Sequence, residues 1–289
     1  SLKANTTASN NTAVGYNSLA ANTTGTANVA VGANALDAST TGSNNTALGF
    51  NSLTANTTGT QNVAVGKDVL QSNTTANNNT GLGYLALSSN TTGTENVAVG
   101  VNALGANTTA NRNSASGYFA LRANSTGTQN TGIGHGALTA NTTASDNTGV
   151  GYNCLAANTT GHSNVAVGSG ALDANTTGIN NTAVGNVALG ANTTGQHNAA
   201  FGGAALDANT SGEEITALGA FALSSNTTAD FNTAVGSSAM ESNTTGSNNT
   251  AVGRRALLVN TTGVQQVAVG TNALDADTDG TGCVAIGHN

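Results

Sequence analysis

Residues 11–27 have the sequence NTAVGYNSLAANTTGTA, and close variants of this 17-residue repeat fill the whole chain. Gly15 recurs at the same spacing as Gly32, Gly49 and onward to Gly287, without an insertion or a deletion. Self-similarity at a fixed short period is the sequence signature of a repeat architecture, and it outweighs the propensity of any single segment. This repeat therefore decides the fold class.

A period of 17 residues is too short for a pair of helices, since helical repeats need about 33 residues. Short β-rich runs such as Val29–Val31, each followed by glycine, are typical of one coil of a parallel β-solenoid. Successive coils of such a fold stack at about 4.8 Å, so the whole chain would form a rod of roughly 80 Å. We predict an all-β parallel β-solenoid (β-roll) of seventeen 17-residue coils, forming one continuous domain over residues 1–289 without capping repeats.

Equivalent positions of successive repeats form columns, and several columns are nearly invariant. The position four residues before the glycine, first seen at Asn11, is Asn in 14 of 17 repeats. Stacked amides of this kind can hydrogen-bond along the stack, as in cross-β arrays. The glycine itself is expected to supply backbone angles that a side chain forbids. Leu19 and its equivalents, together with the valine columns, are expected to form the core.

The position two residues before the glycine is always Ala or Gly. Because alternate residues of a strand point to opposite sides, Ala30 would point outward if Val29 and Val31 pointed into the core. An outward position restricted to small residues indicates that another chain, or another part of the coil, lies against it. A tight local bend is the alternative explanation.

The composition excludes several classes of protein. The chain has no Pro and no Trp, only 7% charged residues and a net charge of −7, and its six Lys and Arg are too few for nucleic-acid binding. No apolar run approaches the roughly 18 residues of a membrane span. Cys154 and Cys283 occupy different columns, so two inert small side chains are favoured over a disulfide between chains.

The repeated Asn-Thr-Thr segment matches the acceptor pattern for N-glycosylation. The alternative is that Asn and Thr are selected for turn hydrogen bonds and ladders. The candidate acceptors are Asn5, Asn22, Asn56, Asn73, Asn90, Asn107, Asn124, Asn141, Asn158, Asn175, Asn192, Asn209, Asn226, Asn243 and Asn260.

One segment resembles the opening of a calcium-binding loop. Asp275, Asp277 and Asp279, followed by Gly280, give the pattern D-x-D-x-D-G. The twelfth position of that loop, where a bidentate Glu belongs, holds Ile286. Calcium is therefore one hypothesis for these carboxylates, and a solvated acidic turn is the other. No other cofactor is expected.

Aromatic residues follow the invariant glycine in every second repeat of the N-terminal half. One explanation is a stripe that makes a lateral contact or binds a ligand. The other is that the pattern results from duplication of a two-repeat segment, and we favour duplication. The residues are Tyr16, Phe50, Tyr84, Tyr118 and Tyr152.

No residue pattern indicates catalysis. The four histidines fall in three different columns and have no partner residue at a fixed offset, and neither a nucleophile motif nor a phosphate loop occurs. We therefore predict that the chain is not an enzyme. The histidines are His135, His162, His197 and His288.

The runs Asn28-Val29-Ala30-Val31-Gly32 and Val284-Ala285-Ile286-Gly287 resemble the N-S-V-A-I-G repeats in head domains of trimeric autotransporter adhesins. The whole repeat over residues 11–27 is also similar to repeats of phage-type tail-fibre proteins. This resemblance implies a left-handed β-roll, a trimer, and an extracellular or cell-surface location. The adhesin coils are somewhat shorter than 17 residues.

These observations predict a structural segment of an extracellular fibre or filament. The first and last repeats stay close to the consensus, and uncapped ends of a solenoid expose strand edges that invite another chain. We expect axial continuation, by head-to-tail stacking or within a longer polypeptide, and lateral association with further copies. The alternative is an adhesin or phage-like tail-fibre shaft that spaces a receptor-binding tip.

Overall fold

The computed structural model describes residues 1–288 and divides the chain into two compact units. The first unit is Ser1–Ser145, and the second begins at Asp146. Residues 1–288 contain β-strands and turns and no helix, so the all-β prediction is confirmed. The prediction of one continuous domain without caps stays a prediction.

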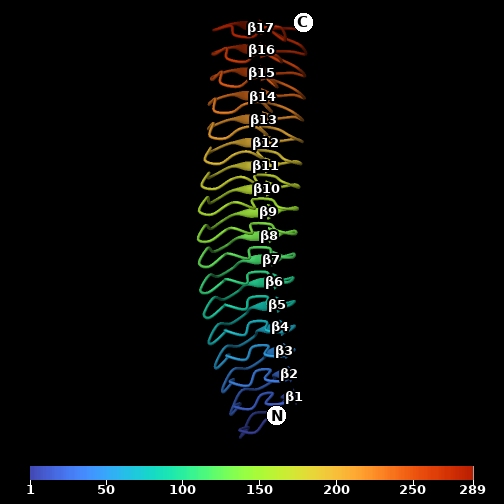
Figure 1. Ribbon diagram of the computed structural model, residues 1–289, viewed down its shortest axis with the longest axis vertical. Helices are drawn as coiled ribbons and strands as arrows, with labels where there is room; N and C mark the ends of the chain where they lie inside the picture. Colours follow the sequence, from blue (N-terminus) through green and yellow to red (C-terminus); the bar gives the residue numbers. More distant parts are fainter. Residues whose placement is uncertain (289) are drawn as a thin grey trace. The chain divides into compact units, whose positions relative to one another are not determined.

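Each coil contains one strand of three residues, placed directly before the invariant glycine (Figure 1). The first unit holds β1 (Thr12–Val14), β2 (Val29–Val31), β3 (Thr46–Leu48), β4 (Val63–Val65), β5 (Thr80–Leu82), β6 (Val97–Val99), β7 (Ser114–Ser116) and β8 (Thr131–Ile133). The second unit holds β9 (Thr148–Val150), β10 (Val165–Val167), β11 (Thr182–Val184), β12 (Ala199–Phe201), β13 (Thr216–Leu218), β14 (Thr233–Val235), β15 (Thr250–Val252), β16 (Val267–Val269) and β17 (Val284–Ile286).

Within each unit, every strand pairs in parallel with the next strand along the chain. The register places equivalent residues opposite each other, as in Thr12 with Val29 and Val14 with Val31. The turns are bonded from coil to coil as well, for example from the Thr23 amide to the Thr40 carbonyl at 2.9 Å. Both units are therefore parallel β-solenoids in which like residues stack on like residues, as the repeat predicted.

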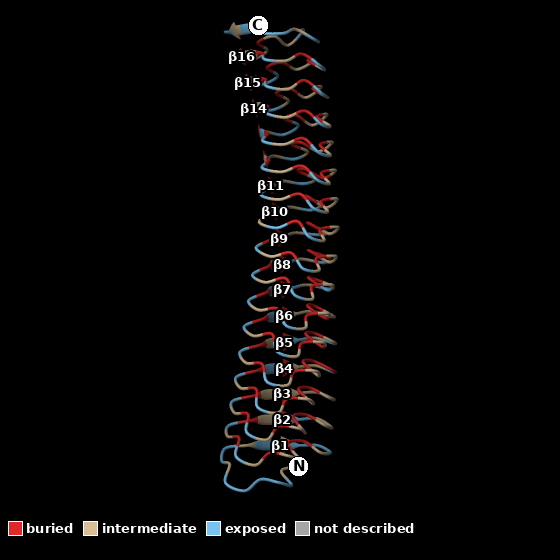
Figure 2. Ribbon diagram, turned by 90° about the vertical axis from the view of Figure 1, so that its left-hand side faces the viewer, coloured by how far each residue is buried: buried red, intermediate tan, exposed pale blue. Residues whose placement is uncertain are grey.

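The expected orientation of the strands was wrong. Ala30 is fully buried, whereas Val31 is 37% exposed, so the alanine column faces the interior and the valines face outward. Buried segments recur at the same place in successive coils of each unit (Figure 2). The leucine column was predicted correctly, since Leu19 and Leu36 are completely buried. The core is thus built from Leu and Ala.

The turn of the preceding repeat explains why the inner column stays small. Gly81 and Gly132 occupy this column, and a Cβ at Gly132 would lie 3.2 Å from Cγ of Leu121. A Cβ at Gly81 would lie 2.5 Å from Cγ1 of Val69 and 3.7 Å from Cδ1 of Leu70. The leucine of the preceding repeat, or the residue just before it, therefore packs directly against the inner face of the strand, and a residue larger than Ala would displace it.

The invariant glycine is required by conformation and by packing. Gly83 has a φ of 121°, a left-handed value that side chains rarely adopt. A Cβ at Gly83 would also lie 2.7 Å from the carbonyl oxygen of Gly100 in the next coil. The first cause was predicted from the sequence, and the second follows from how closely the coils stack.

The core leucines also adopt left-handed backbone angles, which the sequence did not indicate. Leu19 has a φ of 48° and Leu36 a φ of 51°. A left-handed non-glycine residue costs about 1–2 kcal/mol, whereas full burial of a leucine side chain contributes roughly 1.5–3 kcal/mol. Burial therefore offsets the strain, and the sharp turn aims the side chain into the narrow coil.

Candidate functional surfaces

The first ladder consists of the asparagines that precede each strand, and we name it the strand-side ladder. Asn28 donates from Nδ2 to the Gly42 carbonyl at 2.8 Å. Its Oδ1 accepts from the backbone amide of Asn45 in the next coil at 2.9 Å. Both residues are completely buried. Each amide thus joins two coils through a side chain that has no contact with solvent, and the predicted stacking of asparagines is confirmed.

The second ladder, which we name the turn-side ladder, is formed by the asparagine of the Asn-Thr-Thr segment. Asn73 donates from Nδ2 to Oδ1 of Asn56 at 2.9 Å and to the Ala76 carbonyl at 3.2 Å. In one coil of the first unit the column holds Ser39 instead of Asn. There the buried Asn22 Oδ1 and Ser39 Oγ have no hydrogen-bond partner among the described residues. The serine therefore interrupts this ladder.

The turn-side ladder contains the predicted glycosylation acceptors. A glycan on a buried, hydrogen-bonded Nδ2 has no space in the folded chain, so glycosylation stays a prediction for the exposed Asn5 alone. The completely buried candidates are Asn22, Asn56, Asn73, Asn90, Asn107, Asn124, Asn141, Asn158, Asn175, Asn192, Asn209, Asn226, Asn243 and Asn260.

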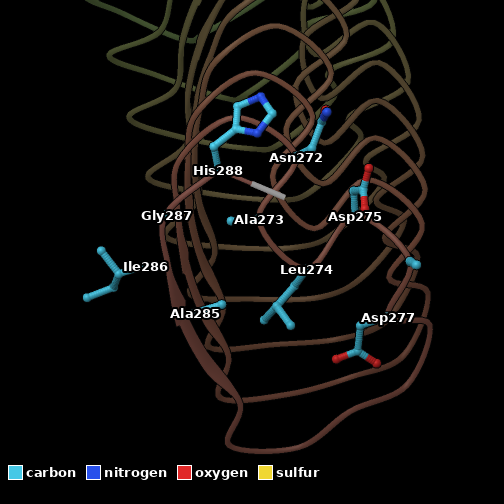
Figure 3. A pocket seen from close by; sticks show the side chains of 10 residues that line it. Asn272, Ala273, Leu274, Asp275, Asp277, Ala285, Ile286, Gly287 and His288 are labelled. Atoms are coloured by element: carbon cyan, nitrogen blue, oxygen red, sulfur yellow. The ribbon is translucent and has the colours of Figure 1, made fainter.

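The three aspartates of the proposed calcium loop lie in the last coil without converging. Asp277 Oδ1 accepts from the Gly280 amide at 3.0 Å, and Asp279 Oδ1 accepts from the Thr278 hydroxyl at 3.4 Å. The carboxylates of Asp275 and Asp277 point in different directions (Figure 3). Residues 1–288 contain no group of three or more His, Cys, Asp or Glu side chains placed to hold a metal ion. A solvated acidic turn describes this segment better than a cation site.

Asp275 and Asp277 instead line a cavity of about 400 Å³ at the surface of the last coil. Leu274 and Ala285 line the same cavity, and they belong to the columns that form the core in other coils (Figure 3). Both are only half-buried here. The cavity is therefore the uncovered core of a coil that has no further coil on this side in the structure.

The outward face of the strands is uncharged and mixes apolar side chains with threonine and serine. Every strand residue is Thr, Ser, Ala, Gly, Val, Leu, Ile or Phe. Val31, Leu82 and Ile133 are among its exposed large side chains in the first unit, and Phe201 and Leu218 in the second. Exposed apolar side chains that recur along one face can mark an interaction site. The sequence analysis placed these residues inside and so missed this face.

A separate column, at the position directly after the invariant glycine, carries the predicted aromatic residues. Tyr16 is 73% exposed, and Phe50 and Tyr84 are exposed as well. Lys67 lies in the coil between Phe50 and Tyr84, and its Nζ is 6.0 Å and 5.1 Å from the two ring centroids. Lys67 also pairs with Asp68 at 2.6 Å, and this hydrogen bond raises the pKa of the lysine. The aromatic residues thus alternate with shorter or cationic side chains along the first unit.

The second unit contains a pair of carboxylates that the sequence did not single out. Asp173 and Asp207 lie in one column, two coils apart, with Gly190 between them. A Cβ at Gly190 would lie 2.9 Å from Asp207 Oδ1 and 3.7 Å from Asp173 Oδ1, so the two groups converge over the glycine. Partial burial raises the pKa of both, and the charge of Asp173 raises the pKa of Asp207 further.

The two cysteines behave as small side chains in different columns. Cys154 is buried and its Sγ donates to the Gly151 carbonyl at 3.3 Å, as Ser18 Oγ does to Gly15 at 3.1 Å. Burial raises the pKa of the Cys154 thiol to about 11, so the reactive thiolate is scarce at neutral pH. Cys283 is half-buried, and neither cysteine is in a disulfide.

The histidines lie in separate environments. The His135 ring stacks on Tyr118 with a centroid distance of 5.1 Å, and His162 Nδ1 is 3.2 Å from the Ser163 hydroxyl. His288 lines the cavity at the last coil. The neighbours described for His135, His162 and His288 are thus different in each case.

No protein-family model matches this sequence, and no curated protein sequence matches it either. Within residues 1–288 the structure has no helix with the length and hydrophobicity of a membrane span. The geometry itself defines a class, the parallel β-solenoids with buried asparagine ladders.

Proposed function

We propose that this chain is a structural segment of an extracellular fibre or filament, with a mechanical role and no catalytic one. The proposal is carried by one observation, the repetition of the same buried amide bonds from coil to coil in each unit. Each coil buries its polar ladders and its leucine only against neighbouring coils. Such a stack can be lengthened by adding further copies of the same repeat, as in other solenoids.

Axial association is the first part of the proposal. In the coil before last, Leu257 and Ala268 are completely buried, whereas Leu274 and Ala285 in the last coil are half-buried. Ala13 in β1 is half-buried too, unlike Ala30 in β2. A further coil in the same register would cover both surfaces. It would come from a second copy stacked head to tail or from the same polypeptide in a longer parent protein.

Lateral association is the second part. The outward strand face is uncharged, and packing it against the same face of another copy would remove its exposed Val, Leu, Ile and Phe side chains from water. The resemblance to autotransporter adhesin heads supports a trimer, a left-handed coil and a location outside the cell. An adhesin or tail-fibre shaft that spaces a receptor-binding tip remains the alternative role, and it rests on the same mechanical properties.

Electron microscopy of the purified protein tests the axial part. We expect filaments longer than one chain from the unaltered protein, and discrete particles from Leu274→Glu, because a carboxylate would be buried at the stacking surface. The matched control is Val284→Glu, which adds the same charge to the outward face of the same coil and leaves axial stacking intact. Short monodisperse particles from the unaltered protein, or filaments from Leu274→Glu, would contradict head-to-tail stacking of separate copies.

A further inference from the structure

The column after the invariant glycine alternates strictly along the first unit. An aromatic ring in one coil is followed by a different side chain in the next coil. We call the space between two such rings, at the coil that lies between them, a slot. The rings are Tyr16, Phe50, Tyr84 and Tyr118, and the residues between or beside them are Ala33, Lys67, Val101 and His135.

Lys67 demonstrates what such a slot accepts. Its side chain extends between the rings on either side, and its ammonium lies over the faces of both Phe50 and Tyr84, at 6.0 Å and 5.1 Å from the centroids. A cation within about 6 Å of an aromatic centroid is attracted by the negative face of the ring. The slot is therefore a two-sided cation–π site that the chain fills with its own lysine.

Other slots of the column also receive basic side chains. Lys3, from the coil before β1, has its Nζ 5.8 Å over the Tyr16 ring and donates to Asn17 Oδ1 at 2.8 Å. The imidazole of His135 stacks on Tyr118 with an interplanar angle of 19°. Rings of this column therefore contact a lysine ammonium at Tyr16 as well as at Phe50 and Tyr84, and the imidazole of His135 at Tyr118.

The slot at Ala33 also lies between two aromatic residues, and its own side chain is much shorter than that of Lys67. The strand register β1–β2–β3 places Ala33 in the coil between Tyr16 and Phe50, as it places Lys67 between Phe50 and Tyr84. Lys3 and Lys67 reach these two rings from the coils on the outer sides. Ala33 contributes only a methyl group between the exposed side chains of Tyr16 and Phe50, which lie about two strand spacings, or roughly 10 Å, apart.

The geometry points to the Ala33 slot as a binding site for an alkylammonium cation, such as the lysine side chain of a partner protein. Lys67 shows that an ammonium fits between rings at this spacing. The net charge of −7 favours the approach of a cationic partner over an anionic one. The ligand class is set by the ring faces, which attract a cation more strongly than a neutral group of the same shape.

Ligand-observed NMR with butyltrimethylammonium as the probe tests this inference. We expect saturable saturation transfer to the methyl groups, and at least tenfold weaker binding to Ala33→Lys, whose own ammonium fills the slot as Lys67 fills its equivalent. The matched control is Val101→Lys, which adds the same charge to the next slot but one in the column and leaves the Ala33 slot unchanged. Circular dichroism confirms that each variant is folded.

A neutral probe separates cation binding from apolar contact. The uncharged analogue 3,3-dimethylbutanol has a similar shape at its branched end, and we expect it to bind at least threefold more weakly than the ammonium. Three results would overturn the inference: no saturable transfer, equal binding by the unaltered protein and Ala33→Lys, or equal binding of the charged and neutral probes.

Discussion

Each buried asparagine amide of the strand-side ladder uses its donor and its acceptor in different directions. Asn45 donates to the Gly59 carbonyl at 2.8 Å and accepts from the Asn62 backbone amide at 3.0 Å. A buried polar group left without a partner costs about 1–3 kcal/mol. At the residue scale, stability therefore depends on the completeness of the ladders more than on the size of any apolar group.

The interruption at Ser39 gives the first prediction. Ser39→Asn should increase the free energy of unfolding by about 1–2 kcal/mol, because the new Nδ2 reaches the unpartnered Asn22 Oδ1. Urea denaturation followed by circular dichroism measures the change. Ser39→Ala is the control. It removes the unpartnered Ser39 hydroxyl but leaves Asn22 Oδ1 without a partner, so it should stabilise the fold less than Ser39→Asn does. A loss of stability in Ser39→Asn would show that the column does not accept an amide there.

The converging carboxylates of the second unit give a pH-dependent prediction. The folded state raises the pKa of Asp207, so it binds the proton more tightly than the unfolded state does. The resulting stability is present below the ordinary aspartate pKa of about 3.9 and is lost as the pH rises through the raised folded value. Asp207→Asn should therefore raise the urea midpoint at pH 7 and leave it nearly unchanged at pH 3.

Asp279→Asn serves as the control, because it removes the same charge from an exposed position of the last coil. We expect a smaller gain at pH 7 from this variant. A lower midpoint for Asp207→Asn at pH 7 would mean that the Asp207 carboxylate stabilises the fold when charged.

The orientation of the strands was the main error of the sequence analysis, and its cause lies at this scale. In a strand such as Val29–Val31 all three residues are apolar, so alternation gives the period but not the side that faces inward. The restriction of the middle column to Ala and Gly was the informative feature. It indicated close packing against Leu, and it was attributed to the outer face.

At the scale of the element, one coil is a three-residue strand followed by turns. A few positions of these turns, the same in each repeat, have left-handed backbone angles. The invariant glycine, which is one of these positions, was recognisable from the repeat. The left-handed leucine was not, because a buried leucine normally adopts extended or helical angles. Tertiary packing overrides the local preference there.

The invariant glycine gives the prediction for the element. Gly83→Ala should lower the free energy of unfolding by about 2 kcal/mol or more, because it adds a side chain at a φ of 121° and places Cβ against the Gly100 carbonyl. Gly203→Ala is the control. Gly203 is exposed and a Cβ there meets no atom within 4 Å, so we expect a change within about 0.5 kcal/mol. Equal effects of the two variants would contradict the packing argument.

At the scale of the whole molecule, stability should depend on register and not on any particular coil. Deletion of residues 80–96 removes one complete 17-residue repeat and joins Asn79 to Val97, which restores the consensus. This variant should fold with a similar melting temperature. Deletion of residues 80–95 leaves one coil with an extra residue, and it should be less stable than the first deletion by about 2 kcal/mol or more. Thermal unfolding of both variants measures the difference.

The repeat predicted the solenoid class, the parallel register and the asparagine ladders, because each follows from the identity of stacked residues. The surfaces were harder to predict. The contact of Lys67 with the rings of Phe50 and Tyr84 and the convergence of Asp173 with Asp207 both depend on residues at variable positions of the repeat. A consensus sequence does not show which residues occupy these positions in neighbouring coils. The calcium pattern Asp275–Asp279 failed for the opposite reason, since a linear motif does not ensure that its carboxylates converge.

X-ray fibre diffraction from an aligned sample tests the stacking most directly. Parallel coils in register predict a sharp reflection at about 4.8 Å along the direction of coil stacking. A pattern without that reflection, or one dominated by the 5.4 Å and 1.5 Å spacings of α-helices, would contradict the account.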